Sequence, residues 1–327
     1  MLYAPTTSNY LFMSEIRIFY REDNRLKLSQ DIEVLKRSPM ENLLWIDLND
    51  VPEEAESRLE QFLKIYIQEE EEMEEIEISS RYMETDNSLV ANSRFLLSNF
   101  EEETVSFIIK DNTLVSVRSQ ELPSFNDTMR KLFASPRSYP TGYHVLTTLL
   151  ETRVDYDADL IEDLTREITE LSGHLKSEED VDNAILIAIK ELQERTMIIR
   201  ENIVDKQRVC SNIIKSILIP ADAKAKMNIL LKDINSLFEH IRFSFDRLEY
   251  MQDTFLGLVN IQQNKIIKIF TIVSVVFMPP TLVASIYGMN FKVMPELDWK
   301  YGYPFAIVLM ICGVVGILWY FKRKKWF

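Results

Sequence analysis

Two long uncharged apolar runs near the C-terminus constrain this chain more than any other feature of its sequence. Residues 269–286 and 304–321 each give eighteen positions without a charged side chain. A helix that crosses a bilayer needs about 20 such residues, within a range of about 17–25. Both runs are apolar on all faces, which disfavours the alternative of two core helices in a soluble domain. The sequence therefore predicts two membrane spans.

Charge divides the chain just before these runs. The 327 residues include 51 acidic and 37 basic side chains, for a net charge of −14. Residues 266–327 carry a net charge of +5, which leaves −19 on residues 1–265. An acidic body disfavours nucleic acid as a partner, because phosphate binding needs a basic face. Two cysteines, Cys210 and Cys312, exclude a disulfide framework.

The basic residues around the two runs predict how the chain is oriented. Lys265 and Lys268 precede the first run, and four basic residues at 322–325 follow the second. The connecting loop, 288–303, has two residues of each sign. The positive-inside rule then places both termini in the cytoplasm and the loop outside, with the lipid bilayer around the two spans.

The body combines strand and helix patterns first and becomes almost purely helical after Pro123. We expect strands at 15–21, 43–48, 76–78, 88–97, 104–109 and 113–118, with a helix at 52–68. Further helices are expected at about 124–135, 142–172, 179–217 and 222–287. The fold class is therefore an α+β cytoplasmic domain followed by long helices, the last a very long stalk continuous with the first span.

This pattern predicts six segments along the chain. They are an α/β domain at 1–135, an acidic helical hairpin region at 136–221, the stalk and first span at 222–287, an external loop at 288–303, the second span at 304–321 and a basic cytoplasmic tail at 322–327.

One stripe of the long helix is small or polar at nearly every step. Alternating steps of four and three mark a seam with a period of 3.5, as between parallel helices. Such residues either allow close helix packing or line water. Three polar members just below the membrane favour the second explanation, in which the stripe lines a water-filled axis. Two spans cannot enclose a channel, so such an axis would require several copies in a ring. The stripe comprises Asp253, Gly257, Asn260, Asn264, Ile267, Thr271, Ser274, Met278, Thr281, Ser285 and Gly288.

The end of the first span carries a family resemblance. Residues 287–291 read Tyr-Gly-Met-Asn-Phe and residues 294–297 read Met-Pro-Glu-Leu, which resembles the signature of the CorA magnesium transporters. The agreement is strong over about 253–327, and over the acidic body only the order of elements agrees.

The resemblance implies a funnel-shaped homopentamer in which the first span lines the pore and the second packs outside it. It also implies inward passage of Mg²⁺, with Co²⁺ and Ni²⁺ as lesser substrates, across a bacterial inner membrane. The related zinc-transporting branch shares Gly-Met-Asn but has a different loop. A non-transporting coiled-coil scaffold would need a uniformly apolar seam. An enzyme is disfavoured because no nucleophile–base pair is evident, and no organic cofactor is expected.

The resemblance further implies a selectivity filter where the first span ends, at Tyr287, Gly288, Met289, Asn290 and Phe291. A helix C-terminus offers free carbonyls and partial negative charge, which suit hydrated Mg²⁺. The alternative is a simple helix stop with left-handed glycine and asparagine, and the two roles are compatible. Expected metal contacts are Gly288, Asn290, Asn264 and Asp253.

Other residues are expected along the same path. Ile267, Phe270 and Met278 could form an apolar constriction that gates by dewetting. Glu296 and Asp298 in the external loop either concentrate cations by their field or are ordinary solvated charges.

The acidic body offers candidates for feedback by bound Mg²⁺. Solvated helix faces are the default explanation of such clusters. The resemblance implies regulatory sites between subunits, where Mg²⁺ would bridge facing carboxylates. The candidates are Glu84, Asp86, Asp155, Asp157, Asp159 and Asp233.

Overall fold

The computed structural model describes residues 15–23, 25–68, 81–175, 182–290, 292, 294–295 and 298–324. Contacts divide the chain into two compact units, Met1–Gly173 with Ala184–Met251, and His174–Asn183 with Gln252–Phe327. Helix α8 (Ala221–Tyr287) contributes to both units as one helix of 67 residues.

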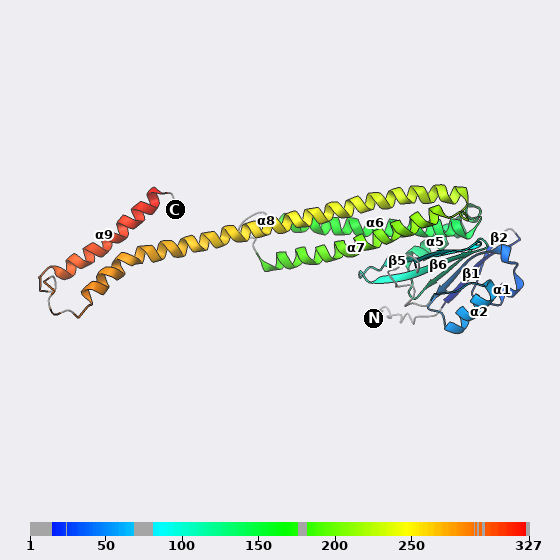
Figure 1. The fold of residues 1–327 in the computed structure, drawn as a ribbon, viewed down its shortest axis with the longest axis horizontal. Helices are drawn as coiled ribbons and strands as arrows, with labels where there is room; N and C mark the ends of the chain where they lie inside the picture. The colour runs from blue at the N-terminus through cyan, green and yellow to red at the C-terminus, as the bar shows by residue number, and fades with distance from the viewer. Residues whose placement is uncertain are drawn as a thin grey trace, which may run out of the picture. The chain divides into compact units, whose positions relative to one another are not determined.

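A mixed sheet organises the first unit (Figure 1). Its strand order is β2-β1-β3-β7-β6-β5-β4, in which β3 and β7 are parallel and the other neighbours are antiparallel. The strands are β1 (Glu15–Glu22), β2 (Arg25–Ser29), β3 (Leu43–Asn49), β4 (Tyr82–Glu84), β5 (Ser88–Leu96), β6 (Glu102–Lys110) and β7 (Thr113–Arg118).

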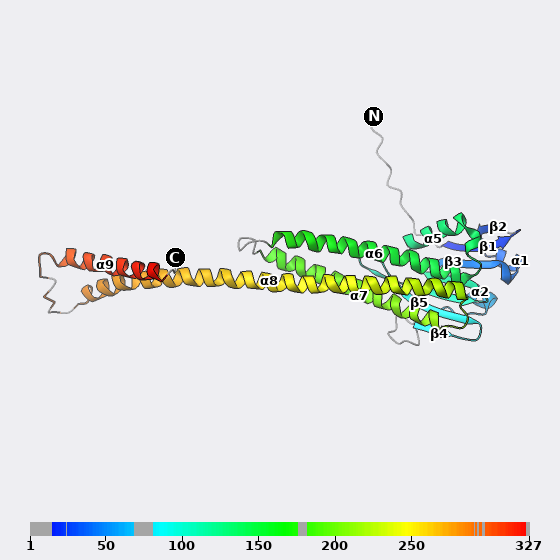
Figure 2. The ribbon, with the colours of Figure 1, turned by 90° about the horizontal axis from the view of Figure 1, so that it is seen from above.

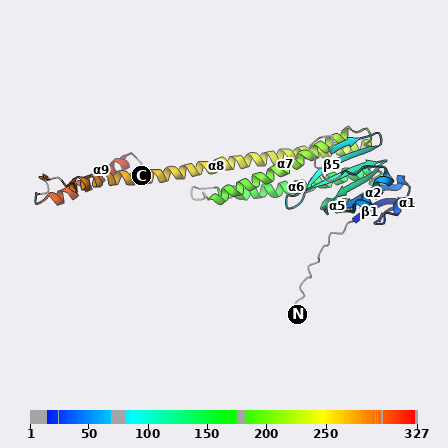
Figure 3. The ribbon, with the colours of Figure 1, turned by 60° about the horizontal axis from the view of Figure 1, so that its bottom comes forward.

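Every residue of β3 and β7 is buried, polar residues included, because both faces of the central strands are covered. On one face, Ile18 and Ile46 pack with Leu59 in a cluster that includes α1 (Val34–Arg37) and α2 (Glu53–Leu63). On the other face, the Trp45 ring stacks on Phe19 with centroids 4.7 Å apart. Phe125 of α5 (Pro123–Ala134) contacts Trp45 on this second face, so α2 and α5, both labelled in Figure 3, cover opposite faces of the sheet.

Three long helices complete the first unit. They are α6 (Gly142–His174), α7 (Asn183–Lys215) and the N-terminal part of α8, which lie side by side (Figures 1 and 2). Helix α6 begins against the β6–β7 turn, where the Gly142 N–H donates to the Asn112 carbonyl at 2.6 Å. Asp111 and Asn112 have φ of 47° and 70°, so the expected hairpin turn is confirmed.

The second unit contains the C-terminal part of α8 and helix α9 (Gly302–Arg323). Both helices contain a window that is long and apolar enough to cross a membrane. Pro279 and Pro280 lie inside α8 without ending it.

Most expected elements are confirmed, with shifts at their ends. Helix α2 is shorter than expected because Lys64 adopts a left-handed conformation with φ of 52°. Strands β2 and β4 were not predicted from the sequence, and the expected strand at 76–78 lies outside the described residues. Helix α8 begins one residue before the expected range of 222–287 and ends at the expected residue.

Candidate ion pathway

The first span ends at the expected Gly-Met-Asn segment. The Gly288 N–H donates to the Ala284 carbonyl at 2.9 Å, and the Met289 N–H donates to the Ile286 carbonyl at 3.3 Å. Gly288, Met289 and Asn290 are exposed, while Tyr287 is half-buried. The other carbonyls at this helix end lie where a continuing helix would have supplied donors, so they are available to a cation.

Gly288 does not adopt the left-handed conformation that a simple helix stop at this glycine would have. Its φ is not positive, so that form of the helix-stop alternative is wrong for this glycine. A Cβ at this position would lie 3.0 Å from the Ala284 carbonyl oxygen, which explains why a residue without a side chain fits here. Phe291 and Glu296 lie outside the described residues, and Asp298 is exposed.

Burial divides the membrane part of α8 into two faces. Ile272 is 8% exposed, and Val276, Pro279 and Val283 are half-buried. Gly313 of α9 packs against this face, because a Cβ on the glycine would lie 2.8 Å from the Pro279 Cβ. This face of α8 is therefore the one that meets α9.

The small and polar stripe lies on the other side of α8. At about 100° per residue, its members point about half a turn away from the α9 contact. The predicted lining face is therefore exposed in the single chain. Its members in the span are exposed: Thr271, Ser274, Met278, Thr281 and Ser285.

Hydroxyl groups on this stripe bond back to their own helix. Thr271 Oγ1 donates to the Ile267 carbonyl at 2.8 Å, and Thr281 Oγ1 donates to the Phe277 carbonyl at 2.7 Å. Ser274 Oγ does the same to Phe270 at 2.9 Å. Each hydroxyl proton is therefore satisfied, and the oxygen lone pairs stay available for water or a hydrated ion.

The remaining predicted lining residues are also exposed in the single chain. Asp253, Asn260 and Asn264 form the polar part of the stripe, and Ile267 and Phe270 are 62% and 69% exposed. The structure brings these residues onto one helix face but does not by itself surround them with other copies.

Three of the predicted regulatory carboxylates share one neighbourhood. Burial raises the pKa of Asp155 on α6, and the charges of Asp159 and Asp233 raise it further against the opposing effect of Lys131. Helices α6 and α8 therefore present carboxylates to one another. A cation that bridged these carboxylates would relieve the repulsion between them.

The other regulatory candidates have different surroundings. Asp157 is 1% exposed; it pairs with Arg153, and Lys206 Nζ lies 3.1 Å from its Oδ2. Glu84 accepts hydrogen bonds from Tyr82 and Ser216, each at 2.7 Å.

Asp86 is exposed between β4 and β5. Among the residues that the structure describes, no three His, Cys, Asp or Glu side chains converge to hold a metal ion.

Sequence reasoning missed the cations that neutralise Asp157. Lys206 is fully buried, and its Nζ also donates to the Arg94 carbonyl at 2.9 Å. The spacing of four between Arg153 and Asp157 on one helix was the signal that could have revealed half of this cluster.

Together these features define a membrane protein with two spans, in which an N-terminal α/β domain precedes a long helix that continues into the first span. A family model described as "CorA-like Mg2+ transporter protein" matches residues 40–323. The chain belongs to the CorA family, as its sequence signature predicted. This is a family of transporters rather than enzymes.

Individual relatives agree with this assignment. The magnesium transport protein CorA of Wolinella succinogenes is 39% identical over 293 residues, covering 87% of this chain and 91% of that protein. The protein of the same name from Escherichia coli K12 is 36% identical over 319 residues, covering 94% and 98%. The solved CorA magnesium transporter of Methanocaldococcus jannaschii has a TM-score of 0.82 at 20% identity, covering 97% of this chain and all of that one.

Proposed function

We propose that this protein is a channel that carries Mg²⁺ into the cell down the membrane potential. The observation that carries the proposal is the polar stripe of α8, which is exposed on the side opposite the α9 contact. Its relatives are named magnesium transport proteins, and they match almost the whole chain.

A ring of five copies would bring the stripes of α8 around one axis, with α9 outside and the acidic domains forming a funnel. Both termini would lie in the cytoplasm and the 288–303 loop outside, in the inner membrane of a bacterium. Moving two charges inward yields about 4.6 kcal/mol per 100 mV, so no nucleotide is needed as an energy source.

The filter would select ions through neutral oxygens. Mg²⁺ gives up its water reluctantly, so carbonyls of Gly288 and Met289 and the Asn290 amide would bind its hydration shell. Neutral ligands also allow release, which conduction requires. Ile267, Phe270 and Met278 would supply the apolar constriction, and Asn264 and Asp253 further polar rings.

Closure would follow from Mg²⁺ bound to the acidic domain. Asp155, Asp159 and Asp233 form the best-supported group, because the charges of Asp159 and Asp233 raise the pKa of Asp155. A cation there would remove the repulsion between α6 and α8 and favour one arrangement of these helices.

Reconstitution in liposomes that contain a magnesium-sensitive dye tests the transport proposal. We expect Asn290→Ala to abolish Mg²⁺ entry while the protein remains assembled. The matched control is Asn228→Ala, because Asn228 is also on α8 but is exposed in the first unit. Normal flux through Asn290→Ala would contradict the filter assignment.

The same liposomes separate the alternatives. Entry of Mg²⁺ with weaker entry of Co²⁺ and Ni²⁺ supports the proposal, whereas Zn²⁺ entry without Mg²⁺ entry would favour a zinc transporter. Entry of none of these ions would leave a membrane-anchored scaffold as the better explanation.

A further inference from the structure

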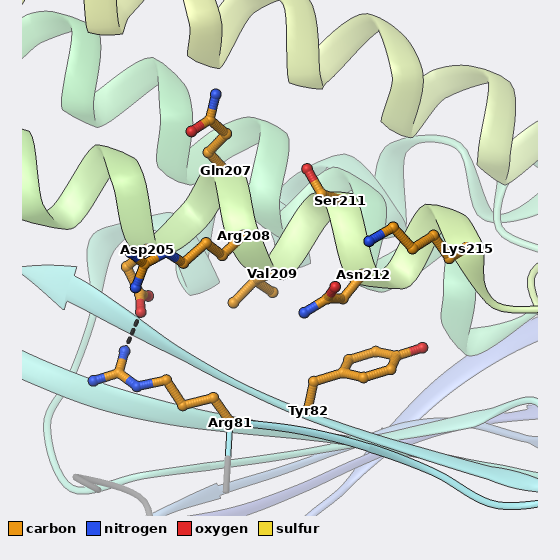
Figure 4. Close-up of a pocket in the computed structure, with 9 residues that line it drawn as sticks. All are labelled: Arg81, Tyr82, Asp205, Gln207, Arg208, Val209, Ser211, Asn212 and Lys215. Carbon is orange, nitrogen blue, oxygen red and sulfur yellow. Dashed lines mark hydrogen bonds and ion pairs between the residues drawn. The ribbon is translucent and has the colours of Figure 1, made fainter. Parts of the chain in front are cut away.

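A cationic pocket in the first unit has no role in the ion pathway. It has a volume of about 270 Å³ and lies between the start of β4 and one face of α7 (Figure 4). The lining residues are Arg81, Tyr82, Asp205, Gln207, Arg208, Val209, Ser211, Asn212 and Lys215. Three cations and one carboxylate make it positive within a body whose net charge is −19.

Two contacts hold β4 against α7 on either side of this pocket. At one end Arg81 forms an ion pair with Asp205, which also accepts hydrogen bonds from Ser93 Oγ and the Arg94 N–H. At the other end Ser216 Oγ donates to Glu84 at 2.7 Å. The pocket is therefore bordered by β4 and α7, which these two contacts hold together.

The cations of α7 are the groups that a ligand could bind. Arg208 and Lys215 are exposed, and neither makes an ion pair with any residue that the structure describes. In Figure 4, Arg208 extends toward the Asp205 end, while Lys215 points back along α7 toward Ser211 and Asn212. A guanidinium and an ammonium in one pocket suit phosphate or carboxylate and repel Mg²⁺.

The rest of the lining favours a ligand with a flat ring. The Tyr82 hydroxyl already donates to Glu84 at 2.7 Å, so its ring rather than its hydroxyl is the surface that the pocket offers. Figure 4 shows this ring below Asn212, with Val209 beside it. An aromatic face stacks with planar rings, and the nearby amide and hydroxyl groups can bond to ring edges.

We propose that this pocket binds a small anion of the nucleoside-phosphate class, with its ring on Tyr82 and its anionic end bound by the cations of α7, Arg208 and Lys215. The volume is close to the lower end for small-molecule sites, about 300–1,000 Å³, which fits a mononucleotide rather than a larger ligand. The site is separate from the proposed filter, so it does not depend on the transport proposal.

Titration of AMP and ADP into the detergent-purified full-length protein, followed by calorimetry in EDTA, tests this site. We expect saturable binding that weakens at least tenfold in Arg208→Gln and in Lys215→Gln, because each removes a charged hydrogen bond. Tyr82→Leu should weaken binding, and Tyr82→Phe should retain it because the ring remains.

The matched control is Lys190→Gln, which removes an exposed cation of α7 outside the pocket and should leave binding unchanged. Thermal unfolding of each variant shows that it remains folded. Absence of saturable nucleotide binding would overturn the proposal. An equal loss of nucleotide binding in Lys190→Gln would also overturn it. So would competition by inorganic phosphate that is as strong as competition by AMP. Mg²⁺ flux of the wild type is measured separately, in nucleotide-free liposomes, so the two proposals can fail separately.

Discussion

Gly313 of α9 lies directly against Pro279 of α8, so close that a Cβ on the glycine would come within 2.8 Å of the proline Cβ. This contact joins the two spans at the point where consecutive prolines lie inside α8. It also sets which side of α8 faces α9, and therefore which side remains for the ion path. Small residues of this kind allow transmembrane helices to approach closely.

Gly313→Ala should disturb this contact. The added methyl group must push α8 and α9 apart, at a cost of about 1–3 kcal/mol. We expect a lower thermal unfolding temperature of the purified protein and reduced Mg²⁺ uptake. Gly316→Ala is the matched control, since a Cβ there meets nothing within 4 Å. Equal behaviour of the two variants would show that the contact is not needed.

A neighbouring pair of positions tests the lining face of α8. Ser274 lies on the polar stripe, and Val273 points about 100° away at almost the same depth. In a Cys312→Ser background, we expect a cationic thiol reagent to block Mg²⁺ flux through Ser274→Cys and to leave Val273→Cys unaffected. Equal block of both variants would argue against the stripe as the lining.

Much of this organisation could be predicted from the sequence. The α8 helix was placed within one residue, because no residue before Tyr287 forces an end and its apolar run is long. The hairpin between β6 and β7 was clear from Asp111 and Asn112. Strand β2 was missed although its sequence, Arg-Leu-Lys-Leu-Ser, alternates, because it is an edge strand of five residues of which three are exposed.

The carboxylates of the body show what spacing could not decide. Asp155 and Asp157 are two residues apart on α6, and helical geometry turns them to different sides. Only the fold reveals that Asp157 faces Lys206 of α7 while Asp155 lies near Asp233 of α8. Contacts between helices that are distant in sequence cannot be read from the composition of one helix.

Gly142→Ala should destabilise the first unit. A Cβ at Gly142 would lie 2.4 Å from the Leu114 nitrogen and 2.8 Å from the Asn112 carbonyl oxygen, and neither backbone atom can move without disturbing the sheet. We expect a loss of more than about 2 kcal/mol in the free energy of unfolding, seen as a lower melting temperature or poor expression. Gly173→Ala, where a Cβ meets nothing within 4 Å, should be close to wild type.

Lys206 should make the stability of the first unit depend on alkaline pH. Burial lowers the pKa of Lys206 to about 8, against the opposing attraction of Asp157. Between about 8 and the ordinary value of 10.5 the unfolded chain binds a proton that the folded chain has released. The contribution of Lys206 to stability therefore rises with pH across that window.

Comparison with Lys206→Met isolates this effect, because methionine does not titrate. The free energy of unfolding of the wild type minus that of Lys206→Met should increase from pH 8 to 10.5. We expect an increase on the order of 3 kcal/mol. Lys190→Met, at an exposed position of α7, should show no such change. An advantage that is independent of pH would contradict the lowered pKa.

Asp155→Asn should make the protein more stable when divalent cations are absent. Because the pKa of Asp155 is raised by burial and by Asp159 and Asp233, its charged form is disfavoured in the folded state. The stability that its protonated form contributes is lost as the pH rises through the folded pKa, so at neutral pH the charge destabilises the fold. We expect a higher melting temperature in EDTA for this variant.

The wild type should gain more from MgCl₂ than Asp155→Asn does, because the bound cation relieves the same repulsion. Glu162→Gln, an exposed carboxylate of α6, should respond to Mg²⁺ as the wild type does. An identical response in all three proteins would remove these carboxylates from the regulatory site.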